Sequence, residues 1–120
     1  MVILQIAILH SEDGAVCDYM SSARITVYRD GEGWRRAREI ALTPPPTDSV
    51  TAAREHIKMT ALSLAPCAII AGTEISGLAY QVYDSLSFLI FKIESLYRFI
   101  RSLLPDVNTK ARYHFIRAAQ

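Results

Sequence analysis

The chain has 120 residues, 51% of them apolar, which is enough for one globular domain with a core of its own. Thirteen basic and twelve acidic residues leave a net charge of +1, which argues against nucleic acid or an anionic membrane as partner. No apolar stretch reaches the ~20 residues of a bilayer-spanning helix. Because the two cysteines lie far apart and no signal peptide is evident, we expect a reduced, cytoplasmic protein.

The first part of the chain predicts three antiparallel strands. Residues 2–9, VILQIAIL, are nearly all apolar, which is typical of a central strand. A polar turn at 10–14 and an irregular segment at 15–22 separate it from a second strand at 23–29. The glycine-rich turn at 30–33 then predicts a hairpin, with residues 34–42 as its second arm.

Three prolines in the segment Thr43–Thr47 end the hairpin because they remove ladder donors. Asp48 or Ser49 is expected to cap a helix over residues 50–64. Its buried stripe is predicted from helical spacing to be Val50, Ala53, Ile57, Ala61 and Leu64.

The most informative stretch runs from Cys67 to Glu94. An apolar run at 67–71 predicts a buried strand, and Gly72 begins a turn that continues to Gly77. A helix follows with Leu78, Val82 and Leu86 on one face, and a second apolar run at 88–93 closes a βαβ unit. Because ligands of open α/β sheets bind beyond the carboxyl ends of strands, residues 72–77 are the expected wall of a site.

After Glu94, helical spacing resumes in residues 96–104 and Pro105 ends it. Residues 105–120 then form a C-terminal tail that can pack on the domain. We therefore expect one α/β domain over residues 1–104 with the order β-β-β-α-β-α-β-α. A mixed five-stranded sheet flanked by helices, in the ribonuclease-H-like arrangement, buries this order best, with a flavodoxin-like sheet as the alternative.

No catalytic motif is present: the chain has no phosphate loop, no nucleophile elbow and no His-Glu-x-x-His zinc motif. Ribonuclease-H-type nucleases need several carboxylates around a metal, and the first strand carries none. We therefore expect a protein that is not an enzyme.

The candidate ligands lie near the carboxyl ends of the first and fourth strands. Cys17, His10 and Met20 belong to the segment after the first strand, and a thiolate, an imidazole and a thioether suit a soft metal or an iron–sulfur species. The alternative is that Cys17 and Met20 are packing residues. Glu74 is the best-placed carboxylate, either as a cap of the next helix or as a ligand or partner contact.

Three further side chains have structural interpretations. Cys67 opens a buried strand and is expected to be a small core residue. His56 is expected to be solvated on the outer face of the first helix. The basic cluster Arg35, Arg36 and Arg38 is most simply a solvated face.

The stretch from Cys67 to Glu94 resembles the AnfO family of iron-only nitrogenase accessory proteins. The resemblance rests on Gly72, the Ile75-Ser76-Gly77 turn, Tyr80 and the sequence Phe91-Lys92-Ile93-Glu94, with agreement in the N-terminal strands at Ile25–Tyr28 and Gly33-Trp34. It covers roughly residues 3 to 94.

The layout is also similar to that of the dinitrogenase cofactor-binding family, which has a ribonuclease-H-like fold and carries iron–sulfur nitrogenase cofactors or their precursors. The His-Phe-Gly motif of that family falls here on Asp18-Tyr19-Met20, so the histidine is absent and the adjacent Cys17 is its replacement. The resemblance implies nitrogenase subunits or cofactor-assembly proteins as partners. It implies either cofactor delivery or enzyme assembly as the role. The alternative is a metal-free interaction module that uses the 72–77 turn and the tail to dock on a partner subunit.

Overall fold

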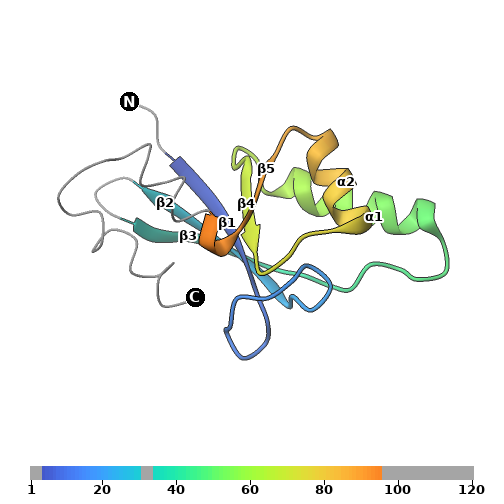
Figure 1. Cartoon of the computed structure of the whole chain (residues 1–120), viewed down its shortest axis with the longest axis horizontal. Helices are drawn as coiled ribbons and strands as arrows, with labels where there is room; N and C mark the ends of the chain where they lie inside the picture. Colours follow the sequence, from blue (N-terminus) through green and yellow to red (C-terminus); the bar gives the residue numbers. More distant parts are fainter. Residues whose placement is uncertain (1–3, 31–33, 96–120) are drawn as a thin grey trace.

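The computed structural model describes residues 4–30 and 34–95 (Figure 1). The predicted turn at 31–33, the helix at 96–104 and the tail at 105–120 lie outside the described residues. The elements follow the predicted order: β1 Leu4–His10, β2 Arg24–Asp30, β3 Trp34–Ala41, α1 Val50–Ser63, β4 Ile69–Gly72, α2 Gly77–Ser85 and β5 Leu89–Lys92.

The strands form one mixed sheet of five strands in the order β3-β2-β1-β4-β5. β2 pairs antiparallel with β1 and with β3, whereas β4 pairs parallel with β1 and with β5. The predicted mixed five-stranded sheet is thereby confirmed, and the ribonuclease-H-like label stays a prediction. β1 lies at the centre, and Ile6, Ala7, Ile8 and Leu9 are at most 1% exposed.

Both described helices pack on one face of the sheet (Figure 1). Ala7 and Leu9 of β1 share one apolar cluster with Ile57 of α1 and Val82 of α2. Since side chains alternate along a strand, Ile8 points to the opposite face and is also buried. The sheet is therefore apolar on both faces at its centre.

The buried faces of the two helices differ from the predicted ones at their edges. Ser49 caps α1, its side chain accepting a hydrogen bond from the backbone N–H of Ala52 at 3.2 Å. Val50, predicted to be buried, is 69% exposed because it lies in the first turn, ahead of the residues that reach the core.

In α2 the fully buried residues are Ala79, Val82 and Tyr83, whereas the predicted Leu78 and Leu86 are half-buried. The stripe is rotated because Tyr83 packs edge-on against Phe88, with ring centroids 4.9 Å apart. Burial of the large Tyr83 ring thus determines which face of α2 packs against the core.

Two other predictions concern single side chains. Cys67 is 3% exposed, which confirms it as a core residue. His56 was expected to be solvated, but it is half-buried and its Nε2 lies 2.9 Å from the hydroxyl of Thr43. The segment after β3 folds back onto α1 and supplies that contact.

Arg38 of β3 caps the carboxyl end of α1, which has no basic residue in its own last turn. Its guanidinium donates to the carbonyl of Ser63 at 2.9 Å, to that of Ala65 at 2.8 Å and to that of Leu64. A cation at this end complements the helix dipole and satisfies carbonyls that have no partner within the helix.

Gly72, the last residue of β4, allows a close backbone approach. A Cβ at this position would lie 2.6 Å from the carbonyl oxygen of Cys17 and 2.9 Å from Cδ1 of Leu9. Because one of these neighbours is backbone, a side chain at residue 72 would push the segment containing Cys17 away from the sheet.

Replacing Arg38 by methionine should lower the free energy of unfolding by about 2 kcal/mol, because three carbonyls lose a charged donor. Urea denaturation measures the change. Arg35→Met on the same strand is the control, since Arg35 is exposed and makes no such contact within the described residues. An equal loss in both variants would contradict the capping role.

Gly72→Ala should lower the free energy of unfolding by about 2 kcal/mol through overpacking. Gly77→Ala is the matched control. Nothing lies within 4 Å of a Cβ at residue 77, so the only cost to the alanine variant is the backbone strain of a φ of +60°. That strain costs about 1 kcal/mol. If Gly72→Ala is as stable in urea as the wild type, the segment containing Cys17 moves away from residue 72 at no cost in stability, and the overpacking prediction is wrong.

Candidate functional site

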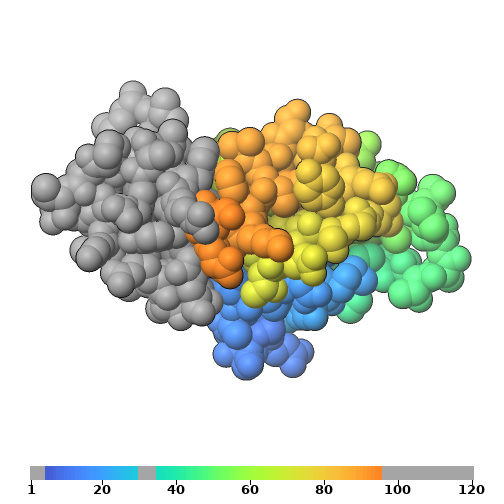
Figure 2. Space-filling model, in the orientation of Figure 1, coloured from blue at the N-terminus to red at the C-terminus, as the bar shows by residue number. Residues whose placement is uncertain are grey.

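The candidate site is the sheet edge where β1 and β4 end. It consists of the β1–β2 loop, residues 11–23, and the strand-end turn, residues 73–76. Two backbone hydrogen bonds join these segments: Thr73 N–H to the Cys17 carbonyl at 3.0 Å and Tyr19 N–H to the Glu74 carbonyl at 3.3 Å. Figure 2 shows the loop, in blue, directly against the turn, in yellow. The predicted meeting of the two segments is confirmed.

The β1–β2 loop has its own internal hydrogen bonds. The N–H of Ser11 donates to the carbonyl of Ala15 at 2.9 Å, and the Asp13 carboxylate accepts from the Ser11 hydroxyl and from the Ala15 N–H. These two hydrogen bonds lower the pKa of Asp13, and the one from Ser11 has the larger effect. Cys17 N–H donates back to Leu9 at 3.2 Å, so the loop returns to the end of β1 in a defined conformation.

Tyr19 anchors the loop to the helical layer, a role that the sequence analysis did not assign. Its side chain is 3% exposed, and its ring meets that of Tyr83 edge-on with centroids 5.7 Å apart. Burial raises the pKa of both phenols. The only sequence signal was an aromatic residue inside a segment of small and polar side chains.

Cys17 is half-buried and packs against the apolar cluster on the helix side of the sheet. Burial, and then the negative charges of Asp18 and Asp13, raise the pKa of its thiol. The thiol is therefore protonated at neutral pH, and a metal must displace that proton in order to bind. Such a cysteine is a weak nucleophile, and it can bind a metal only after its thiol has lost the proton.

Met20 follows on the same loop and is 63% exposed. It borders two cavities, one of about 500 Å³ beside Ser11 and Asp13, and one of about 310 Å³. The smaller cavity lies between the proline segment and the two helices, and Pro45 and Leu78 are part of its lining. The thioether is thus accessible at the rim of an apolar hollow.

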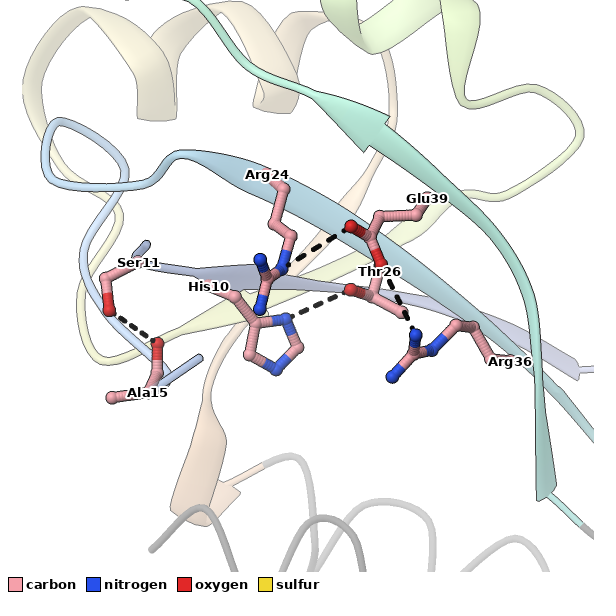
Figure 3. Close-up of polar contacts among 7 residues, drawn as sticks. All are labelled: His10, Ser11, Ala15, Arg24, Thr26, Arg36 and Glu39. Carbon is pink, nitrogen blue, oxygen red and sulfur yellow. Dashed lines mark hydrogen bonds and ion pairs between the residues drawn. The ribbon is translucent and has the colours of Figure 1, made fainter. Parts of the chain in front are cut away.

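His10 lies on the other face of the sheet (Figure 3). Its Nδ1 is 3.1 Å from the hydroxyl of Thr26, which is 1% exposed. Burial first, and then the charges of Arg24 and Arg36, lower the pKa of the imidazole, while Glu39 acts in the opposite direction. The ring is accordingly neutral at pH 7.

Glu74 is exposed in the strand-end turn. The N-cap of α2 is Ser76, so Glu74 does not cap that helix as the structural interpretation predicted. Its backbone carbonyl holds Tyr19, as noted above, and its carboxylate is accessible from solvent.

The structure brings Cys17, Met20 and Glu74 to one edge of the sheet but leaves His10 on the opposite face. Side-chain alternation explains the separation, because Leu9 points to the helices and His10, the next residue, points away from them. Within residues 4–30 and 34–95, no three His, Cys, Asp or Glu side chains are placed to hold a metal ion. The ligand roles of the four residues stay predictions.

No helix of the described part of the chain is long and apolar enough to cross a membrane. Among solved structures, the chain is similar to the crystal structure of PH0822, with a TM-score of 0.53 and 13% identity. The match covers 74% of this chain and 78% of that chain, and at such identity it shows the fold alone. No curated protein matches the chain.

The sequence profile described as "Iron only nitrogenase protein AnfO" matches residues 5–115. That range includes every described strand and helix except the first residue of β1, Leu4, together with the loop and the turn at the candidate site. The resemblance drawn from the residues around Gly72 is thereby confirmed over nearly the whole chain, which belongs to the AnfO family of iron-only nitrogenase proteins.

Proposed function

We propose that this protein is a non-enzymatic, cytoplasmic accessory protein of the iron-only nitrogenase. It contacts the iron–sulfur cofactor of that enzyme, or a precursor, transiently through Cys17 and so assists delivery or assembly. The observation that carries the proposal is the position of Cys17. It is a partly exposed thiol on a loop tied to the carboxyl edge of β4, in a chain of this family.

The donor set suits a transient cargo rather than a resident group. Thiol and thioether sulfur are soft donors that match iron–sulfur species, and Cys17 and Met20 supply one of each. Only the cysteine gains a charge on binding, and it must first lose a proton from a thiol whose pKa is raised. A single ligand that must first be deprotonated binds an iron–sulfur species weakly, and weak binding favours release of that species to a partner.

A metal-free interaction module is the second candidate, and the exposed apolar side chains favour it. Met20 is 63% exposed, and α1 presents Met59 at 58% and Leu62 at 50%. Exposed methionines adapt to varied partner surfaces. In this alternative the loop docks on a nitrogenase subunit or a cofactor-assembly protein without touching the cofactor.

The accessory role predicts a growth defect. A strain that lacks the gene should grow slowly on N₂ when neither molybdenum nor vanadium is available, because the iron-only enzyme is then the one nitrogenase in use. Growth with fixed nitrogen is the control and should be unaffected. Normal growth of the deletion strain on N₂ under those conditions would count against the proposal.

The cofactor contact predicts a difference between the two cysteines. In an anaerobic titration with isolated cofactor, Cys17→Ala should lose most of the binding, whereas Cys67→Ala should keep it, because Cys67 is 3% exposed. Binding should strengthen as pH rises, since the raised pKa of Cys17 leaves little thiolate at neutral pH. Equal binding by the wild type and Cys17→Ala would remove this cysteine and favour the interaction module.

A further inference from the structure

The antiparallel pair β2–β3 carries a concentration of arginine. Arg24 and Arg29 lie on β2, and Arg35, Arg36 and Arg38 lie on β3. The two strands hold only two carboxylates, Asp30 and Glu39, although the chain as a whole has a net charge of only +1. Positive charge is therefore gathered on one flank of the sheet.

Three of the five arginines have a clear role within the fold. Arg24 and Arg36 share the carboxylate of Glu39, at 3.6 and 3.5 Å (Figure 3). Arg38 donates to the carbonyls at the end of α1, as described above. Each of these three side chains thus has a partner within the protein.

Arg29 and Arg35 differ from the other three. They stand directly opposite each other in the β2–β3 register, and both are exposed. Neither makes an ion pair or a side-chain hydrogen bond with the rest of residues 4–30 and 34–95. Like charges directly opposite on neighbouring strands destabilise a sheet. The fold therefore places two arginines opposite each other on neighbouring strands, and neither has a counter-charge in the described part of the chain.

The position of this pair favours contact through side chains. β3 is an edge strand, so no other strand within residues 4–30 and 34–95 pairs with its outer side. The register shifts between Val27 and Tyr28, a bulge that discourages addition of another strand, as do the charges themselves. Two adjacent planar guanidinium groups instead match carboxylates, each of which can accept two hydrogen bonds.

We propose that Arg29 and Arg35 form a docking surface for an acidic patch on a protein component of the iron-only nitrogenase. The choice of partner rests on the proposed function. Acidic protein is favoured over nucleic acid because a phosphate backbone is held by many cationic contacts, whereas here two arginines stand unpaired in a chain of charge +1.

The docking surface and the candidate site lie at opposite ends of the sheet. Arg29 pairs with Gln5 near the start of β1, whereas the β1–β2 loop follows His10 at its end. A partner held by the arginines thus contacts the end of the sheet that is remote from the loop with Cys17. Docking and cofactor contact can take place in the same complex.

The test compares the affinity of three proteins for the purified, cofactor-free catalytic component of the iron-only nitrogenase by biolayer interferometry. Arg29→Gln/Arg35→Gln should raise the Kd about tenfold at low salt, because close charge pairs across an interface dominate such contacts. The control Arg54→Gln/Lys58→Gln removes the same charge from the exposed face of α1 and should change the Kd by no more than about twofold. High salt should shrink the difference.

Each other result overturns the inference. Equal weakening by both double variants would show attraction by net charge alone, and no complex with the wild type would show that this component is not docked. Binding to duplex DNA that is tighter than to the component, and lost in Arg29→Gln/Arg35→Gln, would reassign the surface to nucleic acid. Thermal unfolding confirms that the arginine variant is folded, and removing a like-charge pair should not lower its Tm.

The growth experiment distinguishes failure of the docking surface from failure of the accessory role. A deletion strain with a growth defect that is rescued by the Arg29→Gln/Arg35→Gln gene would sustain the accessory role and overturn the docking surface. A deletion strain without a defect would instead overturn the accessory role itself.

Discussion

The parallel pairing of β1 with β4 is the constraint on which the rest of the structure depends. It brings the carboxyl ends of two strands that are far apart in sequence to one edge, with Ala7 opposite Ile70 and Ile8 opposite Ala71. The β1–β2 loop can then bond to the strand-end turn, through Thr73 and Tyr19. The contact is close because Gly72 has no side chain. A loop that would otherwise move independently is held against the sheet, with Cys17 partly accessible.

The same pairing explains why the candidate site is chemically sparse. The centre of the sheet is apolar on both faces, and the polar side chains of its described strands lie near strand ends or at the flank formed by β2 and β3. Cys17 lies at the strand ends, whereas His10 joins Thr26 and the arginines on the far face. Burial acts on both groups in the direction that disfavours charge, leaving a protonated thiol and a neutral imidazole. The proposed transient contact with a cofactor rests on this absence of charge on the two groups.

The arginines of β2 and β3 differ in whether they have a partner within the fold. Arg24 and Arg36 share Glu39, and Arg38 donates to carbonyls at the carboxyl end of α1. The remaining pair, Arg29 and Arg35, faces solvent at the opposite end of the sheet from the loop. In the proposed accessory role, the arginine pair would contact a partner and the loop would contact the cargo.

The sequence by itself determined the order of the elements, the central place of β1 and the family. Continuous apolar runs and the Gly72–Gly77 turn are local signals, and they depend on burial and backbone geometry rather than on distant contacts. It was less accurate for the face of α2, because the packing of Tyr83 on Phe88 selects the buried stripe. Tertiary structure alone decided that His10 and Cys17 lie on opposite faces, since one residue of strand alternation reverses the direction of a side chain. It also decided which arginines have a partner within the fold, because Glu39 and the end of α1 reach those arginines only through strand register and helix packing.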